Sequence, residues 1–401
     1  MEKKLFQKDI VLFFLITLLF FVSISAFDPF ISPYAKELGI SPSAIGGIVG
    51  VAGLASLFTR LPVGILSDVF LKRKLFLQVG LLVTIIPWTL AFLTPNATTL
   101  YLGKISDGLT GSTWVVYNVM FASYFGKKEA GKAVAILAAA SPTGSLLGST
   151  IGGIAANVYG YNFSFLVAVI AASVAFLLTL FLKEQKLDVG QPKYRPSVLV
   201  EQLSDKNLWI ISILTIVCEM AVFGMRDTFV PLVAVDLGAN PIIISWLSNT
   251  HKILDGIIAA FCAVYLFQKW GYVRTAVIGG LLHGFAAICI PFATNLPMLF
   301  GLQAVAGIAF SLSFTALFSL SIMNVAEHKQ STRMGFYQSM YSFGIFVGPV
   351  LMGILAERFS RDVSFFFIAI LSVVAAIVTR LLLKSDTPEE QIVQEDISYY
   401  T

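Results

Sequence analysis

The sequence predicts an all-α polytopic membrane protein with twelve transmembrane helices, and three observations support this fold class. The 401 residues are 57% hydrophobic and 12% charged, with a mean hydropathy of +0.84, unlike a soluble domain. Apolar runs of about 20 residues, the length that crosses the ~30 Å hydrocarbon layer, recur from end to end. Lys and Arg gather in alternate polar gaps, as the loops on one side of a membrane do.

The apolar runs place twelve spans, and most gaps between them are too short to hold a domain. The first span follows MEKKLFQKDI without a small-residue cleavage site, so we expect it to be retained rather than removed as a signal peptide. The predicted spans lie near residues 9–35, 43–68, 75–94, 98–124, 132–157, 161–183, 207–236, 241–268, 273–293, 297–325, 333–357 and 362–384.

The positions of the basic residues predict the orientation. If both termini lie inside, the inner segments hold 20 of the 27 Lys and Arg residues, and only Lys36, Arg358 and Arg361 lie outside. The net charge of +4 is therefore a topology signal and predicts no nucleic-acid partner. We expect a monomeric, multi-pass protein of the plasma membrane with cytoplasmic termini. Its expected partners are the lipid bilayer, a small-molecule substrate and protons as the coupling ion.

An internal repeat divides the chain into two halves. Residues 25–42 (SAFDPFISPYAKELGISP) match residues 224–241 (GMRDTFVPLVAVDLGANP) at an offset of 199, which pairs Asp28 with Asp227. A repeat of six helices returns in the same orientation, so the halves are predicted to be parallel repeats about an axis along the membrane normal. The predicted domains are a bundle at 1–183, a cytoplasmic linker at 184–206, a second bundle at 207–384 and a disordered cytoplasmic tail at 385–401.

The loop after the second span carries a family signature. It reads GILSDVFLKRK and resembles G-x-L-x-D-R-x-G-R-R/K of the major facilitator superfamily, with Val69 and Leu71 departing from the pattern. The resemblance implies a cytoplasmic gate, with the small residue letting spans 2 and 11 touch. The alternative is that the basic residues act only as topology signals. The implied gate residues are Gly64, Asp68, Lys72 and Arg73.

Spans 5 and 11 carry glycines at helical spacing. Span 5 reads GSLLGSTIGG and resembles the antiporter signature G-x-x-x-G-P-x-x-G-G of the same superfamily, with Ser149 in place of proline. Small residues at this spacing let two helices approach closely, so generic packing is an equal alternative to a mark of export. The expected packing residues are Gly144, Gly148, Gly152, Gly153, Gly344, Gly348 and Pro349.

Several charges lie inside predicted spans. A charge at the bilayer centre costs at least ~2.5–3.5 kcal/mol on insertion scales, so each should face a cavity or a partner. Asp28 and Lys104 both lie about 12 Å below the outer surface by helical rise, which allows an ion pair between spans 1 and 4. On span 8, Asp255 is spaced to meet His251 or Lys252. The candidate proton or substrate residues are Asp28, Lys104, Asp107, Glu219, Arg226, Asp227, His251 and Asp255.

These charges can serve transport or structure. A carboxylate that alternates between water and a low-dielectric site can bind a proton on one side and release it on the other, whereas a structural ion pair does neither. Arg226 precedes Asp227 and is expected to hold it, which makes Asp28 the better candidate for a titrating group. In the superfamily that the chain resembles, spans 1, 4, 7 and 10 line the cavity. Its expected lining is Trp114, Tyr117, Asn118, Gln303, Phe310, Tyr337 and Tyr341, with aromatic packing as the alternative.

The expected function is secondary active transport by alternating access. The residues after span 1 and the span 5 signature resemble the twelve-span drug/proton antiporters, which implies proton-coupled efflux of small amphipathic organic molecules. A proton symporter or facilitator for a metabolite such as a sugar or organic anion is the alternative, and a lipid-handling or non-transport protein is a remote one. The sequence holds no HExxH, GxSxG, P-loop or paired-cysteine motif, so we expect no enzyme, ATP-driven pump, metal site or cofactor.

Overall fold

The structure is a computed structural model in which residues 2–70, 72–125, 133, 136–137, 139–184, 201–323, 325 and 327–383 are described. All regular secondary structure in these ranges is helical, which confirms the all-α class. The first half contains α1 (Glu2–Ser25), η1 (Asp28–Phe30), α2 (Ile31–Glu37), α3 (Pro42–Phe70), α4 (Arg73–Leu93), α5 (Ala97–Ser112), α6 (Trp114–Ala122), α8 (Ala140–Tyr159) and α9 (Phe163–Leu180).

The second half repeats this order of helices. Its elements are α11 (Lys206–Ala221), η3 (Val222–Phe229), α12 (Val230–Asp236), α13 (Pro241–Phe261), η4 (Cys262–Leu266), α14 (Phe267–Cys289), η5 (Ile290–Phe292), α15 (Leu296–Ile322), α16 (Glu327–Arg358) and α17 (Arg361–Leu382).

The described helices account for all twelve predicted spans. Nine helical stretches in the described residues are long and apolar enough to cross a membrane. One of them, Pro241–Phe292, holds two spans joined at Gly271, whose φ of 72° breaks the helix. The predicted fourth span is divided into α5 and α6 at Thr113, and α8 supplies the fifth. Much of the predicted linker and the whole predicted tail lie outside the described residues, so these domain limits stay predictions.

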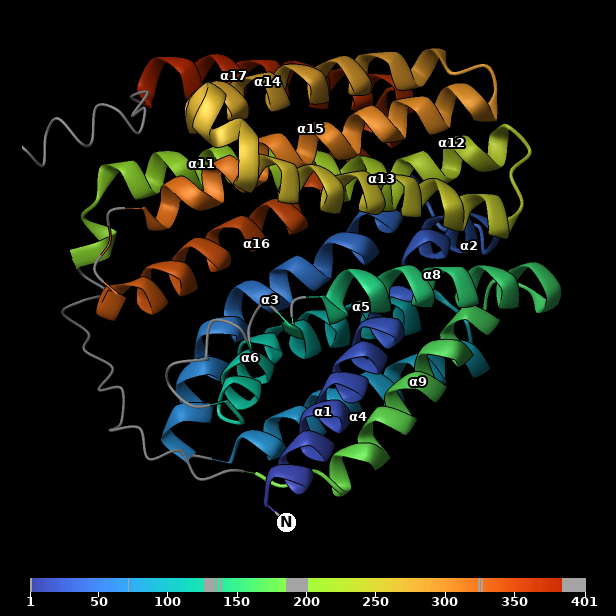
Figure 1. The fold of residues 1–401 in the computed structure, drawn as a ribbon. Coiled ribbons are helices and arrows are strands. Elements are labelled where there is room, and N and C mark those ends of the chain that lie inside the picture. Colours follow the sequence, from blue (N-terminus) through green and yellow to red (C-terminus); the bar gives the residue numbers. More distant parts are fainter. Residues whose placement is uncertain are drawn as a thin grey trace, which may run out of the picture.

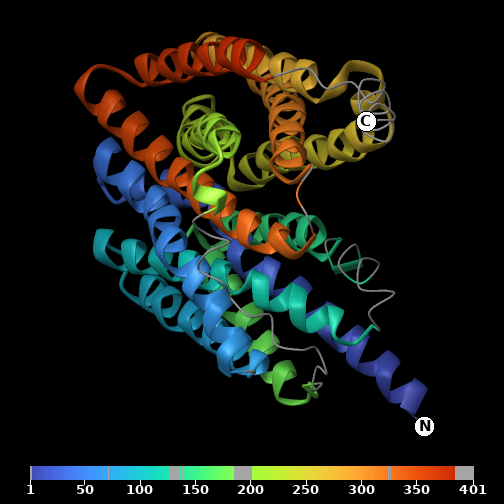
Figure 2. The ribbon, with the colours of Figure 1, turned by 90° about the vertical axis from the view of Figure 1, so that its left-hand side faces the viewer.

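The two sets of six helices lie one above the other in Figure 1, and Figure 2 shows the same division from the side. They meet closely at one end, which we call the closed end and define by the turns at 38–41, 94–96, 160–162, 237–240, 293–295 and 359–360. At the opposite end α3 and α16 spread apart in Figure 1. At the closed end, α8 packs against α13 and α2 against α12, so the two halves contact each other there.

The repeated sequence folds the same way in both halves. Gly39 and Gly238 have φ values of 73° and 82°, the left-handed conformation that glycine adopts without a Cβ clash at the end of a helix. Pro42 and Pro241 then begin the next helices, where a missing N–H is tolerated. The same Gly and Pro therefore end span 1 and begin span 2, and end span 7 and begin span 8.

Glycines let the helices of each half touch along their backbones. A Cβ at Gly148 would come within 2.9 Å of the Val22 Cα on α1, and one at Gly348 within 2.5 Å of the Met220 Cα on α11. Gly148 and Gly348 thus lie where two helices approach closely, as the predicted packing role requires. Because the same register recurs in both halves, these contacts follow the internal repeat.

Gly152 gives a test of this packing. A Cβ there would overlap the backbone carbonyl of Ala26, whereas one at Gly256 would meet nothing within 4 Å. Gly152→Ala is expected to lower the free energy of unfolding by about 1–3 kcal/mol through overpacking. Gly256→Ala should be neutral or slightly stabilising, because alanine is the better helix former. Thermal unfolding of the two detergent-purified variants measures the difference; equal midpoints would contradict the close approach of α8 to α1.

The expected contact of spans 2 and 11 at Gly64 is wrong. A Cβ at Gly64 would meet nothing within 4 Å, whereas one at Gly53 would lie 2.5 Å from the Phe346 backbone nitrogen of α16. The physical reason is the tilt of α3 against α16, which brings them together toward the closed end and apart at the other. The glycines that make this contact are Gly46, Gly50 and Gly53.

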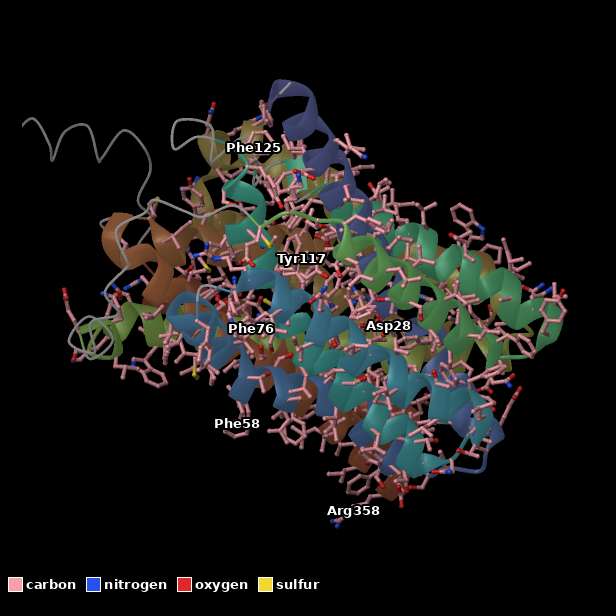
Figure 3. All side chains as sticks on the ribbon, turned by 90° about the horizontal axis from the view of Figure 1, so that it is seen from below. Asp28, Phe58, Phe76, Tyr117, Phe125 and Arg358 are labelled. Atoms are coloured by element: carbon pink, nitrogen blue, oxygen red, sulfur yellow. The ribbon has the colours of Figure 1, made fainter. Side chains whose placement is uncertain are left out.

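Large apolar side chains cover much of the outside of the bundle. Phe58 on α3 projects from the surface in Figure 3 and is 69% exposed. Ile86, Phe181, Val264 and Ile370 are more than half exposed as well. Such a surface suits hydrocarbon and not water, which agrees with a multi-pass membrane protein.

Candidate functional site

Asp28 lies where the first span departs from α-helical geometry. Pro29 has no N–H to donate, and a residue that precedes proline disfavours the α conformation. The chain therefore ends α1 at Ser25, makes one 3₁₀ turn over Asp28–Phe30 and resumes as α2. This break places the Asp28 carboxylate at the edge of a pocket with 26% of its side chain exposed.

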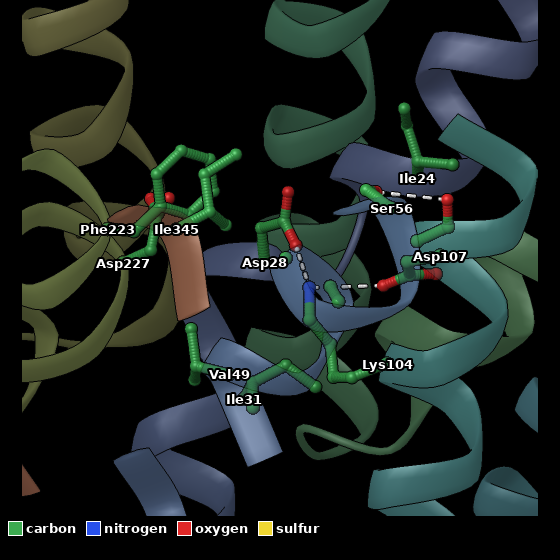
Figure 4. A pocket seen from close by; sticks show the side chains of 13 residues that line it. Ile24, Asp28, Ile31, Val49, Ser56, Lys104, Asp107, Phe223, Asp227 and Ile345 are labelled. Atoms are coloured by element: carbon green, nitrogen blue, oxygen red, sulfur yellow. Dashed lines mark hydrogen bonds and ion pairs between the residues drawn. The ribbon is translucent and has the colours of Figure 1, made fainter. Parts of the chain in front are cut away.

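Lys104 on α5 joins two carboxylates. Its Nζ lies 3.0 Å from Asp28 Oδ1 and 3.0 Å from Asp107 Oδ2, and Figure 4 shows both contacts. The Trp88 indole N–H donates to Asp107 Oδ1 at 2.8 Å, so Asp107 is fixed from both sides. The ion pair expected between Asp28 and Lys104 is present, and Trp88 is a partner that the sequence did not reveal.

This cluster carries one surplus negative charge when both carboxylates are ionised. Lys104 is only 7% exposed, and removing it would leave two buried carboxylates without compensation, at a cost of about 3–5 kcal/mol. Asp28 is the more exposed of the two acids and has the fewer partners among the described residues. Asp28 is thus the carboxylate that water and a ligand can reach.

The pocket beside Asp28 lies between the two halves. It has a volume of about 200 Å³, less than the ~300–1,000 Å³ typical of drug-sized ligands. Figure 4 shows Asp227 and Phe223 of η3 facing Asp28 across it. Its walls are mainly apolar, and its side-chain lining is Ile24, Asp28, Ile31, Val49, Ala52, Ser56, Lys104, Asp107, Phe223, Asp227 and Ile345.

Asp227, the repeat partner of Asp28, is held differently. Arg226 Nε and Nη2 each donate to one Asp227 oxygen at 2.7 Å, which makes a bidentate pair and fits the expectation that Arg226 holds it. Both residues lie in a π-helical turn, η3, a geometry that is frequent at functional sites. The pair is neutral, so the surplus charge of the pocket comes from the first half.

Four of the eight predicted charged residues line this pocket, namely Asp28, Lys104, Asp107 and Asp227. Glu219 on α11 is 4% exposed and has no hydrogen-bond or ion-pair partner among the described residues. The predicted pairing of Asp255 with His251 or Lys252 is wrong, since no such ion pair occurs in the described part of span 8. Spacing on one helix allowed this contact, but His251 is instead buried against α15, where its ring lies 6.1 Å from that of Phe310.

None of the seven predicted aromatic and polar lining residues reaches this pocket. Tyr117 is fully buried against Phe13 and Phe20, and Tyr337 is fully buried with its hydroxyl 2.8 Å from that of Thr215. They pack helices within a half, which was the alternative reading. Trp114, Asn118, Gln303, Phe310 and Tyr341 are also absent from the lining. The apolar part of the lining consists instead of aliphatic residues and Phe223, and composition does not distinguish these from lipid-facing residues.

The predicted gate residues lie at the open end. The Arg73 backbone N–H donates to Glu184 Oε1 at 2.5 Å, and the Lys74 ammonium donates to the carbonyls of Leu180 and Leu182. These contacts stay within the first half. Lys72 is exposed, and the side chain of Asp68 lies outside the described residues, so the gate stays a prediction.

The contacts that join the halves at the closed end include a hydrogen bond from the Ser43 backbone N–H to Glu357 Oε2 at 2.9 Å and two larger sets. The exposed set centres on Asp236, which accepts from Lys36 of the first half at 2.8 Å and from Arg361 of its own half at 2.5 Å. The buried set joins α8 to α13: Ser149 Oγ donates to Asn249 Oδ1 at 2.6 Å, and Asn249 Nδ2 donates to Thr150 at 3.0 Å. Ser245 also donates to the Ser149 carbonyl at 2.8 Å. Ser149, which replaces the signature proline, is therefore a polar contact between halves.

A family model described as Major Facilitator Superfamily matches residues 13–240 and again residues 213–396. An MFS-type transporter of Methanocaldococcus jannaschii is 23% identical over 94% of this chain and 98% of its own length. Multidrug resistance protein MdtG of Proteus mirabilis is 23% identical over 85% and 87% of the two chains. Quinolone resistance protein NorA of Staphylococcus aureus is 25% identical over 89% and 91%.

Two solved structures share the fold. A bacterial homolog of the human lysosomal transporter Spinster, in an inward-facing and occupied conformation, superposes with a TM-score of 0.78 at 15% identity, over 93% of this chain and 95% of that one. The nucleoside transporter NupG gives a TM-score of 0.77 at 16% identity, over 94% and 100% of the two chains. At these identities the likeness concerns the fold alone.

Proposed function

Because the chain belongs to the Major Facilitator Superfamily, and so is a membrane transporter and not an enzyme, we propose that it exports small amphipathic organic molecules in exchange for protons. Two of the relatives are named for resistance to drugs and to quinolones, which supports export. The apolar walls of the pocket support a substrate with apolar surface, and its acids support a cationic group on that substrate.

One observation carries the proposal: beside the neutral Arg226–Asp227 pair, the pocket between the halves holds two further carboxylates, Asp28 and Asp107, and only one lysine, Lys104. A proton or a cationic group can supply the missing positive charge, and the two compete for the same place. A substrate cation bound at Asp28 excludes the proton, and a proton on Asp28 releases the substrate. Competition of this kind is the requirement for exchange.

The proposed transport cycle uses the two ends of the helix bundle in turn. With the closed end shut, substrate reaches Asp28 from the open end, and rocking of the halves then exposes the loaded pocket at the closed end. A proton displaces the substrate there, and the protonated form returns. Lys104 stays held by Asp107 throughout, so the empty form never contains an unpaired lysine.

Orientation and location form part of the proposal. The excess of Lys and Arg supports cytoplasmic termini, which makes the open end cytoplasmic and the closed end external. We further propose a monomer in the plasma membrane, with a cytoplasmic gate at the loop that contains Lys72 and Arg73 and with the domain limits predicted from the sequence.

Transport into inverted membrane vesicles tests the direction and the coupling. Vesicles that contain the protein should accumulate a fluorescent quinolone when their lumen is acidic, and should stop when the pH gradient is collapsed by an ionophore. Matched vesicles without the protein are the control. Accumulation that persists without the gradient would indicate a facilitator, and uptake that requires the opposite gradient would indicate a symporter; either result overturns exchange.

A further inference from the structure

One phenylalanine of the first half is buried in the core of the second half. Phe30 is the last residue of the 3₁₀ turn η1, and its side chain is 0% exposed. Among the described residues, it belongs to an apolar cluster whose other buried members, such as Phe229, all come from the second half. Its neighbours in the chain, Phe27 and Ile31, pack instead into a cluster of the first half. Phe30 therefore crosses from one half to the other.

The internal repeat does not account for this placement of Phe30. Phe30 and Phe229 occupy matching positions in the repeat, at the offset of 199. A symmetric fold would bury each of them in the core of its own half, and Phe229 is buried in this way. Because Phe30 joins the cluster that holds Phe229, both copies of the repeated phenylalanine pack into the same half.

The ring of Phe30 is seated at the crossing of α8 and α13. A Cβ at Gly153 of α8 would lie 3.3 Å from Cζ of Phe30 and 2.8 Å from Cβ of Ser245 on α13, so the missing side chain at Gly153 makes room for both. η1 also packs against η3 of the second half. Ser32, which is fully buried, donates to the Asp227 carbonyl of η3 at 3.3 Å. These contacts hold this segment of the first half against the second half.

The seat of Phe30 lies between the Asp28 pocket and the closed end. By helical rise, Asp28 lies about 12 Å inside Lys36, and Phe30 lies about 9 Å inside it. Gly153 lies at a similar depth from the end of α8. Ile31 is part of the pocket lining, whereas Phe30 is not. In Figure 1, α2 continues from this turn between α8 and the second half. The ring therefore lies just beyond the pocket, on the side of the closed end.

The turn that carries Phe30 also carries Asp28. The Phe30 N–H donates to the Phe27 carbonyl at 2.8 Å, which closes the turn. Pro29, between the two residues, has a fixed φ, so the turn is stiff as well as short. A movement of the Phe30 ring out of its seat therefore displaces the Asp28 carboxylate as well.

We propose that Phe30 is the gate between the Asp28 pocket and the closed end, and that its ring leaves its seat together with the turn that carries Asp28. While it is seated, the ring fills the route from the pocket to the closed end, and its burial favours the closed arrangement. The gate rests on alternating access, which belongs to the proposed function, and not on the substrate, the ion or the direction of transport.

Access of a thiol reagent to the pocket from each side of the membrane tests the gate. Ile24→Cys in the pocket lining is the reporter, in a chain whose three native cysteines are replaced. A membrane-impermeant methanethiosulfonate is added to intact cells and, separately, to inverted vesicles. With Phe30 present, we expect rapid labelling from the side of the open end only. Phe30→Ala should raise the labelling rate from the other side by about 10- to 100-fold, because the closed arrangement loses the burial of the ring.

Phe165→Ala controls for a general loss of packing. Phe165 is also fully buried, but its ring packs against Phe27, Tyr34 and Trp88 of its own half. This variant should unfold at a lower temperature and still be labelled from one side only. Phe30→Leu, which keeps part of the apolar volume, should give an intermediate rate and serves in place of Phe30→Ala if that variant does not fold.

Two results would overturn the gate. One is an unchanged labelling rate from the side of the closed end in the Phe30 variants, and the other is an equal rise in Phe165→Ala. Labelling requires no transported substrate and no pH gradient. Failure of the gate is therefore distinguishable from failure of proton exchange, which the uptake of a quinolone into vesicles tests.

Discussion

Replacing Asp28 by asparagine is expected to abolish transport driven by a pH gradient while the protein remains folded in the membrane. Asparagine matches aspartate in size but cannot take up or release a proton. Lys104 keeps Asp107 as its partner at 3.0 Å, so no buried charge is stranded. Uptake of a fluorescent quinolone into reconstituted vesicles should fall to the level of vesicles without protein.

The neighbouring acids provide controls for this result. Asp28→Glu should retain gradient-driven transport, because it keeps a titrating group. Asp362→Asn, at an exposed position at the start of α17, should have no effect. Asp227→Asn should instead reduce the amount of folded protein, since it leaves Arg226 buried with half of its bidentate pair lost. Full gradient-driven transport by Asp28→Asn would make Asp28 a structural residue.

Replacing Asn249 by leucine is expected to open the closed end. The change removes two hydrogen bonds between the halves, a buried one with Ser149 and a partly buried one with Thr150. Loss of these partners should cost the closed arrangement roughly 1–3 kcal/mol. A shift of that size changes the ratio of closed to open molecules by about 5- to 150-fold.

Distances between spin labels measure this shift. Thr94→Cys and Thr294→Cys place labels on exposed turns of the two halves at the closed end, in a chain whose three native cysteines are replaced. Asn249→Leu should add a longer distance to the distribution. Thr250→Val is the matched control, because among the described residues the Thr250 side chain bonds only to the Trp246 carbonyl of its own helix. An unchanged distribution in Asn249→Leu would show that these bonds do not hold the end closed.

The sequence predicted best what depends on depth and repetition. Span lengths follow from hydrophobic runs, and the common depth of Asp28 and Lys104 follows from the helical rise, so both were found. Gly39 and Gly238 marked the same turn in each half because only a residue without Cβ suits it. Each of these features can be predicted from the sequence of a single helix or turn, without knowing how the helices pack together.

Features that depend on rotation and tilt were missed. Tyr117 and Tyr337 were expected to line the cavity but are buried within their own halves, because a sequence does not give the rotation of a helix about its axis. Gly64 could have been a contact, but the tilt of α3 moves the contact toward Gly53. Trp88 and Ser56, on the third and second spans, approach the site through packing that no local motif encodes.

The exposed ion pair between Lys36 and Asp236 makes the contact between the two halves sensitive to the salt concentration of the surrounding solution. Lys36 and Asp236 are 51% and 41% exposed, so the ion pair between halves weakens as dissolved salt screens it, whereas the buried Ser149–Asn249 bond does not. Raising the ionic strength should thus loosen the closed end by a small amount without adding a ligand. Salinity would then act on the balance of conformations much as an allosteric effector does.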